Sequence, residues 1–157
     1  MKQRWAAVWA AVVLSASIPG IVQAQQQETQ GGAEPKRERV SGSELRQNSP
    51  NPFTTETKIP FTVGDYPKCS DPNRVYRVSL RIYNILSQLV AVPVMQGGSG
   101  NVADGTPLQN VELTCGQYTA YWDAKHIKTK ETVAPGIYIY LYEVDKRPLT
   151  LKMIKGK

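Results

Sequence analysis

The sequence contains a single histidine, His126, and two cysteines, Cys69 and Cys115, among its 157 residues. It has no GxSxG, HExxH, P-loop or dinucleotide-binding motif, and no Cys/His spacing that would hold a metal ion. A lone histidine in a lysine-rich stretch is typical of a surface residue. These absences predict that the protein has no catalytic site, no cofactor site and no metal site.

Long runs of like charge are also absent. The formal net charge is +6 at pH 7, but no block of five or more like charges occurs, so nucleic-acid binding is not expected. Carboxylates that calcium could use occur in loops, at Asp65, Asp71 and Asp104. Their spacing does not fit an EF-hand, and turn residues in contact with solvent are the better interpretation.

The first 24 residues have the organisation of a secretory signal peptide. Lys2 and Arg4 precede an apolar run over residues 5–22, and a small-x-small pattern at residues 22–24 is typical of a cleavage site. The run is also marginally long enough to be an uncleaved membrane anchor. We expect export to the periplasm, the outer surface or the medium, with membrane contact only through an uncleaved signal.

In an exported protein, an even number of cysteines favours a disulfide, here between Cys69 and Cys115. The bridge would close a loop of about 45 residues, for which chain entropy predicts a stabilisation of roughly 4 kcal/mol. Two unpaired thiols are the alternative.

Residues 25–46 are rich in Gln, Glu, Gly and Arg, and their only large aliphatic residues are Val40 and Leu45. Such a segment cannot bury enough apolar surface to offset its chain entropy, so it is predicted to be a disordered leader. The mixed charges at residues 36–39 fit a tail in contact with solvent. Residues 47–157 are the predicted folded domain.

Residues 47–157 contain short runs that alternate apolar and polar side chains, or that are rich in β-branched and aromatic residues. They predict about seven strands, at residues 57–63, 76–83, 89–95, 111–113, 118–122, 136–144 and 149–154. Pro60 places the first strand at a sheet edge or a bulge, and Pro93 interrupts the third. Residues 136–144 are apolar on both faces, which predicts a central strand. The predicted fold is an all-β, Ig-like antiparallel β-sandwich.

A proline-rich segment precedes the first predicted strand. Pro50 and Pro52 fix φ and remove two backbone donors, so the segment cannot lie inside a sheet. It can run along a sheet edge and bury Phe53 as an apolar plug. Further along the chain, Trp122 is interpreted as a core residue and Asp123 as the start of a turn.

Several motifs follow one another in this domain: QNSPNPF at residues 47–53, IYNILSQ at 82–88, YWD at 121–123, PGIYIY at 135–140, and KM at 152–153 before a basic end. With this set the chain resembles the Ig-like domain of the flagellar hook-capping protein and the C-terminal sorting domains of type IX secretion. The resemblance implies an exported, non-enzymatic module whose folded C-terminal domain and basic tail, residues 152–157, are read by the export machinery. The motif residues are Asn48, Pro50, Asn51, Pro52, Phe53, Tyr83, Asn84, Trp122, Asp123, Gly136, Tyr138, Lys152 and Met153.

The chain departs from these families at several turns. Ser87 and Ala124 replace glycines, and Thr129 or Lys130 stands at a further glycine position. Because glycine supplies φ > 0 without a steric cost, these turns are expected to be reshaped. The loops at residues 64–74 and 96–107 look like insertions, which the disulfide would tether.

Two other functions are consistent with the sequence. A structural or adhesion subunit of an envelope assembly would use the apolar face of Ile137, Ile139 and Leu141, and it predicts an oligomer that Leu141→Arg dissociates. A carbohydrate-binding module needs an exposed row of tyrosines, although a sandwich core is their more ordinary location. The expected partners are therefore export machinery, an envelope protein or a surface glycan.

Overall fold

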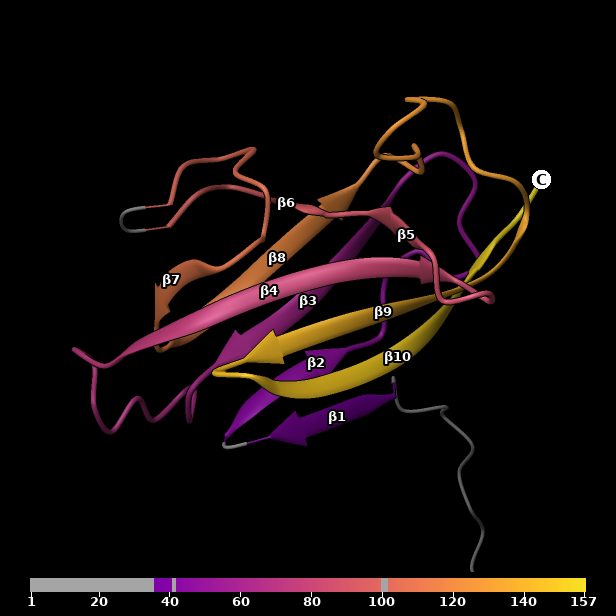
Figure 1. Cartoon of the computed structure of the whole chain (residues 1–157). Helices are drawn as coiled ribbons and strands as arrows, with labels where there is room; N and C mark the ends of the chain where they lie inside the picture. The colour runs from indigo at the N-terminus through magenta and orange to yellow at the C-terminus, as the bar shows by residue number, and fades with distance from the viewer. Residues whose placement is uncertain (1–35, 41, 100–101) are drawn as a thin grey trace, which may run out of the picture. The chain divides into compact units, whose positions relative to one another are not determined.

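The structure is a computed structural model, and it describes residues 36–40, 42–99 and 102–157. These residues form ten strands and no helix, arranged as two antiparallel sheets that pack against each other (Figure 1). The predicted all-β sandwich is therefore confirmed. The strands are β1 (Arg37–Val40), β2 (Ser43–Arg46), β3 (Thr57–Val63), β4 (Val75–Asn84), β5 (Leu89–Ala91), β6 (Val94–Met95), β7 (Val111–Thr114), β8 (Gly116–Trp122), β9 (Gly136–Val144) and β10 (Arg147–Lys155).

One sheet has the strand order β1-β2-β3-β8-β6, and the other has the order β10-β9-β4-β5, with β7 also paired to β4. Strand β9 lies between β10 and β4, which confirms its predicted central position. Within the described residues, no helix has the length and apolar character needed to cross a membrane.

The hydrophobic core lies between the sheets and is built from alternate residues of the strands. On β9, for example, Tyr140 and Tyr142 are fully buried, whereas Ile137 on the opposite face is 51% exposed. This alternation is what a pleated strand with one buried face requires. The largest fully buried side chains are Tyr140, Tyr142, Phe53, Phe61, Leu45, Ile59, Leu80, Ile82, Met95, Leu108, Leu151 and Met153.

The predicted disordered leader is wrong over its C-terminal part, because residues 37–40 and 43–46 pair as the antiparallel strands β1 and β2. Strand β2 pairs with β3, with Leu45 opposite Phe61, and Leu45 is fully buried. The hairpin therefore needs few apolar residues of its own, since it adds to a sheet whose core already exists. Residues 25–35 of the leader and the predicted signal peptide lie outside the described residues.

The prolines interrupt the strands in different ways. Strand β3 is an interior strand with Pro60 inside it, so its predicted edge position is wrong. Lys58 exchanges two backbone hydrogen bonds with Ser49, so the backbone nitrogen of Pro60, two residues later, faces the same side of β3 as Ser49. On this side the pairing with β2 stops at Phe61. No donor is needed there. Pro93 divides the predicted strand 89–95 into β5 in one sheet and β6 in the other. Proline favours such a break because it has no amide hydrogen to donate to a sheet.

The turns at which glycine was expected adopt a left-handed backbone. Ser87, Ala124 and Lys130 all adopt positive φ, at 59°, 56° and 62°. These turns therefore have the left-handed backbone that glycine favours, at a steric cost to the non-glycine residues.

Cys69 and Cys115 form a disulfide with a Cα–Cα distance of 5.5 Å, as predicted. Cys69 lies in the loop that follows β3, and Cys115 lies between β7 and β8. The bridge therefore ties the loop at residues 64–74 to the corner between two strands of different sheets.

Candidate functional site

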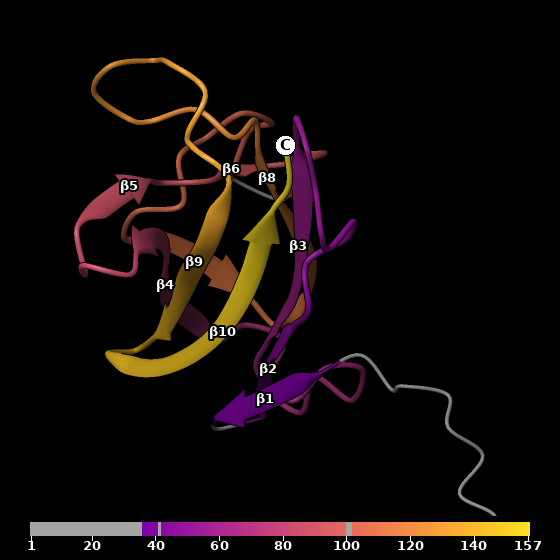
Figure 2. The same ribbon diagram turned by 90° about the vertical axis from the view of Figure 1, so that its right-hand side faces the viewer.

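Most motif residues lie on β10, on β9 beside it, or in residues 47–53, which hydrogen-bond to β10, the strand that leads to the C-terminus (Figure 2). We call residues 47–53 the latch segment, because they run along the free edge of β10. The disulfide lies at the opposite end, since Gly116 pairs with Val63 while Trp122 pairs with Thr57 at the other end of the same two strands.

The latch segment satisfies backbone groups on the free edge of β10. The side chain of Gln47 donates to the Lys152 carbonyl at 2.8 Å, and the Ile154 amide donates to Asn51 Oδ1 at 2.9 Å. The Phe53 amide then donates to the Ile154 carbonyl at 3.0 Å. An edge strand covered in this way is not a template for pairing with another chain.

Strand β1 and a proline complete this edge. The Thr150 amide donates to Glu38 Oε2 at 3.0 Å, and Pro148 on the same side has no amide hydrogen to satisfy. The edge of β10 is thus capped along most of its length by side chains from β1 and the latch segment.

Asn48 holds the latch segment together. Its side-chain amide donates to the Pro50 carbonyl and to Thr57 Oγ1, both at 2.9 Å, and the side chain is buried. Its backbone amide donates to the Tyr140 hydroxyl at 3.1 Å, and that hydroxyl donates to the Arg46 carbonyl at 3.0 Å. Burial raises the pKa of Tyr140, so the hydroxyl stays protonated and can act as this donor.

Phe53 is the buried plug that the sequence predicted, with 1% of its surface exposed. Its ring lies 5.5 Å from the ring of Trp122, which contacts Tyr138 edge-on at 5.6 Å. Met153 is fully buried and stands opposite Tyr138 in the β9–β10 register. These motif residues, taken from four separate stretches of sequence, therefore form one part of the core.

The remaining motif residues shape turns or face outward. Asp123 Oδ1 accepts from the Lys125 amide at 3.1 Å, which confirms its predicted turn role. Asn84 Oδ1 accepts from two amides of the turn that follows β4. Tyr83 is half-buried on the outer face of β4, and Gly136 begins β9 opposite Lys155. Pro50 and Pro52 are exposed, and both follow cis peptide bonds.

The predicted basic tail is largely part of a strand, because β10 extends to Lys155. The Lys155 side chain is buried, and its ammonium group donates to the Gly156 carbonyl at 2.9 Å. Lys152 and Lys157 are the two basic residues of this tail that are exposed.

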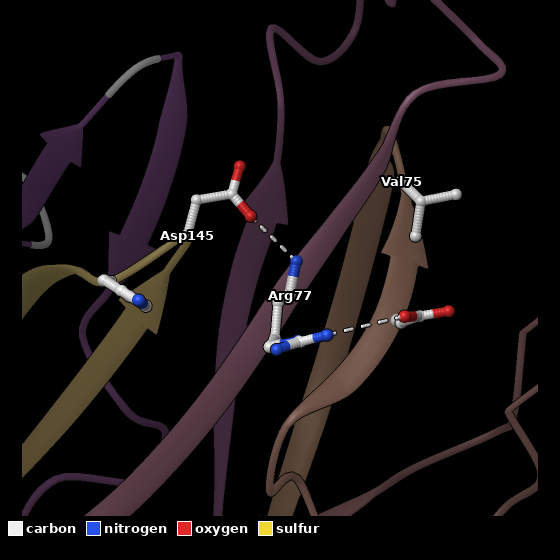
Figure 3. A pocket seen from close by; sticks show the side chains of 5 residues that line it. Val75, Arg77 and Asp145 are labelled. Carbon is white, nitrogen blue, oxygen red and sulfur yellow. Dashed lines mark hydrogen bonds and ion pairs between the residues drawn. The ribbon is translucent and has the colours of Figure 1, made fainter.

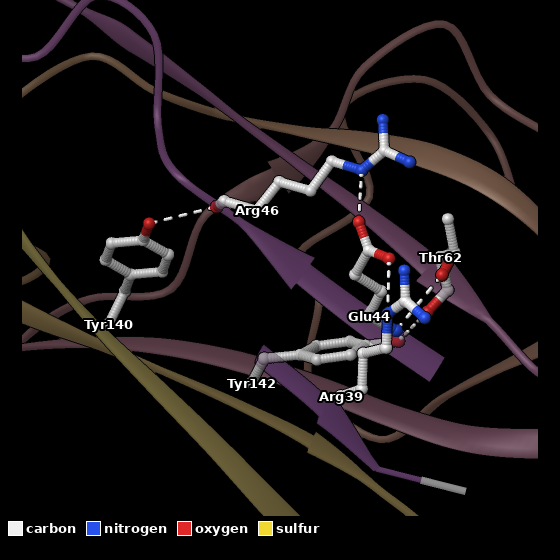
Figure 4. Close-up of polar contacts among 6 residues, drawn as sticks. All are labelled: Arg39, Glu44, Arg46, Thr62, Tyr140 and Tyr142. Carbon is white, nitrogen blue, oxygen red and sulfur yellow. Dashed lines mark hydrogen bonds and ion pairs between the residues drawn. The ribbon is translucent and has the colours of Figure 1, made fainter. Parts of the chain in front are cut away.

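A charged cluster fixes the β1–β2 hairpin to β3 (Figure 4). Glu44 Oε2 lies 3.0 Å from Arg39 Nε, its Oε1 lies 2.7 Å from Arg46 Nε, and its amide donates to Thr62 Oγ1. Burial raises the pKa of Glu44, but the two guanidinium groups outweigh burial and hold that pKa below its ordinary value.

A cavity of about 410 Å³ lies at the opposite end (Figure 3). It is lined by Val75, Arg77, Glu112, Asp145 and Lys146. Asp145 Oδ1 accepts from the Arg77 amide at 2.9 Å, and the Arg77 side chain pairs with Glu112 at 3.9 Å. Arg77 and Glu112 therefore pair in an open hollow, while Asp145 is held by the Arg77 backbone.

The candidate calcium ligands act within their own loops. Asp65 accepts from the Ser70 amide and hydroxyl, and these hydrogen bonds lower the pKa of its carboxyl. Asp71 accepts from the Asn73 amide, and Asp104 accepts from the Gly97 amide. Across the described part of the chain, no group of three or more His, Cys, Asp or Glu residues is placed to hold a metal ion.

The tyrosines line the core, as the more ordinary interpretation predicted. Tyr118, Tyr138, Tyr140 and Tyr142 are buried, and the half-buried Tyr121 donates to Glu56 at 2.7 Å. The exposed aromatic row that glycan stacking needs is therefore not formed by these five residues.

Sequence reasoning missed the roles of Gln47 and Glu38 as caps of β10. Glu38 lies in the stretch assigned to the leader, where the Ser41-Gly42 dipeptide was the available signal for a hairpin. Comparison of the chain with models of known protein families, with curated proteins and with solved structures finds no match.

Proposed function

We propose that the chain is an exported, non-enzymatic β-sandwich module that acts in type IX-type sorting or in cell-surface anchoring. The observation that carries this proposal is the grouping of the motif residues around the C-terminal strand. The latch segment fixes β10 in one register, while Lys152 and Lys157 remain exposed. A signal that is read in its folded form needs this combination of a rigid terminal strand and accessible charged groups.

Two further observations support the proposal. The Cys69–Cys115 disulfide is compatible with an oxidising compartment such as the periplasm or the cell exterior. His126 forms a hydrogen bond within its own loop, because its Nδ1 accepts from the Lys128 amide at 3.2 Å. This contact fits a structural role for the histidine.

To test this proposal, the full chain is expressed in a bacterium that has the type IX pathway. Intact masses, with and without reductant, are measured in the periplasmic, surface and medium fractions. A Lys152→Gln/Lys157→Gln variant is compared with Lys68→Gln/Lys146→Gln, which removes two exposed lysines at the opposite end of the sandwich.

We expect the wild type and the control to reach the surface or the medium, and the Lys152/Lys157 variant to remain in the periplasm. Loss of the C-terminal domain from the exported wild type would identify a sorting signal, and its retention would identify an anchoring module. Equal export of both variants, or retention of the wild type in the periplasm, contradicts the proposal.

A further inference from the structure

Six of the eight large apolar side chains that are exposed in the described part of the chain lie at one end of the sandwich. We call them the aliphatic rim. They are Ile85, Leu86, Leu89, Ile127, Ile137 and Ile154. The other two, Tyr66 and Val75, lie elsewhere.

Strand register places several rim residues close to one another. Ile137 of β9 is paired with Ile154 of β10. The last pair between β4 and β9 joins Asn84 to Tyr138, so Ile85 follows directly beside the start of β9. On the other side of the turn, Leu89 pairs with Tyr83 in β4. The loop after β8 and the turn after β4 lie at this same end in both views (Figures 1 and 2).

The turn after β4 presents two adjacent side chains to solvent, with Ile85 71% and Leu86 72% exposed. The turn is tightly built, because Asn84 Oδ1 accepts from the Leu86 and Gln88 amides, both at 3.0 Å, and Ser87 adopts positive φ. Polar residues are the usual choice in such a turn. Core packing therefore does not account for a rigid turn that exposes two large aliphatic side chains.

The rim is accompanied by positive charge. Lys152 lies on the outer face of β10 opposite Ile139, Lys128 follows Ile127 in the loop, and Lys157 follows the end of β10. None of these three lysines has an ion-pair partner among residues 36–40, 42–99 and 102–157. The apolar surface is thus bordered by cations that face solvent.

We propose that the aliphatic rim binds an anionic lipid surface, with Ile85 and Leu86 inserted below the headgroups and the three lysines in contact with them. Exposed apolar patches mark interaction sites, and basic residues near a surface of acidic lipids add to the attraction. Protein-binding hot spots are instead enriched in Trp, Tyr and Arg. All six rim side chains are aliphatic, and Ile85 and Leu86 lie on the turn after β4, which suits a deformable partner.

This lipid contact is separate from the proposed function. It also differs from the membrane contact that the sequence predicts, which runs only through an uncleaved signal peptide. It is tested with vesicles, without any export machinery. Flotation uses the full chain and, in parallel, residues 33–157, a compact unit that contains the whole described core. The shorter form lacks the apolar run at residues 5–22, which could itself bind lipid.

Vesicles of phosphatidylcholine mixed with anionic phosphatidylglycerol are compared with vesicles of phosphatidylcholine alone. The test variant is Ile85→Ser/Leu86→Ser. The control is Val75→Ser, which removes an exposed aliphatic side chain, 53% exposed, at the other end of β4. A third variant, Lys128→Gln/Lys157→Gln, tests the charges. Circular dichroism confirms that each variant is folded.

We expect residues 33–157 to bind the anionic vesicles and to bind phosphatidylcholine at least tenfold more weakly. The Ile85/Leu86 variant should lose at least tenfold in binding, the lysine variant should lose severalfold, and Val75→Ser should bind like the wild type. Absence of binding to the anionic vesicles overturns the proposal, as does an Ile85/Leu86 variant that binds normally. A dimer that the Ile85/Leu86 variant dissociates, without vesicle binding, would assign the rim to a second copy of the chain instead.

Discussion

Replacing Tyr140 with phenylalanine tests whether one buried hydroxyl holds the latch segment on the sheet. The hydroxyl donates to the Arg46 carbonyl at 3.0 Å and accepts from the Asn48 amide at 3.1 Å. It also contacts Gln47 Nε2 at 3.4 Å, a group that water can reach. The substitution removes these bonds while it keeps the fully buried ring in place.

The expected loss follows from the two backbone partners. The Asn48 amide loses its partner in a buried region and the Arg46 carbonyl in a partly buried one, and an unsatisfied buried polar group costs about 1–3 kcal/mol. We therefore expect Tyr140→Phe to lower the free energy of unfolding by about 2–4 kcal/mol. For a domain of this size, this corresponds to a fall in Tm of roughly 10 °C.

Tyr138→Phe is the matched control on the same face of β9. Its hydroxyl donates only to the Ala134 carbonyl, at 2.7 Å, in an exposed segment where water can replace it. The expected loss is about 0.5–1 kcal/mol. Urea unfolding followed by far-ultraviolet circular dichroism, with the disulfide intact, measures both variants. Equal losses, or a larger loss for Tyr138→Phe, would refute the reasoning about the latch segment.

Three further outcomes are expected. Reducing the disulfide, or Cys69→Ser/Cys115→Ser, should lower the free energy of unfolding by roughly 4 kcal/mol for a bridge that spans 46 residues, as urea titration will show. Ser87→Gly and Lys130→Gly should each raise Tm slightly, with about 0.5–1 kcal/mol gained from relief of positive φ, whereas a decrease would argue against strain at these turns. Burial raises the pKa of the three inward tyrosines of β9 above 10.0, so they stay protonated in the folded protein at a pH where the unfolded chain ionises. The free energy of unfolding should therefore fall as the pH rises above about 10. A flat profile from pH 9 to 12 would contradict this.

The strands were predictable where their pattern was local. Residues 136–144 carry their own alternation and β-branched or aromatic residues, and β9 has those bounds. Residues 37–46 do not, because the hairpin is stabilised by Leu45 opposite Phe61 and by ion pairs of Glu44 with Arg39 and Arg46. These contacts depend on a sheet that the local composition does not reveal.

The candidate site was predictable as a set of motifs but not as a structure. The sequence indicated that Phe53 is a buried plug, and its contact with Trp122 bears this out. It did not indicate that Gln47 and Asn51 cap β10, because the register of two segments about 100 residues apart is set by the folded sheet. Likewise, positive φ at Ser87 could not be read from the residue, since serine rarely adopts it.

The motif positions divide into two groups, and the division indicates where function lies. Asn48, Phe53 and Trp122 are fully explained by the fold, since each is buried and its substitution would disturb the core or the latch segment. Lys152, and Leu86 within the IYNILSQ stretch, are exposed, and the fold makes no use of their side chains in the described contacts. A residue that contributes little to stability is free to contact a partner. Substitutions in the exposed group should therefore alter export or lipid binding while they leave the unfolding curve unchanged, and substitutions in the buried group should do the reverse.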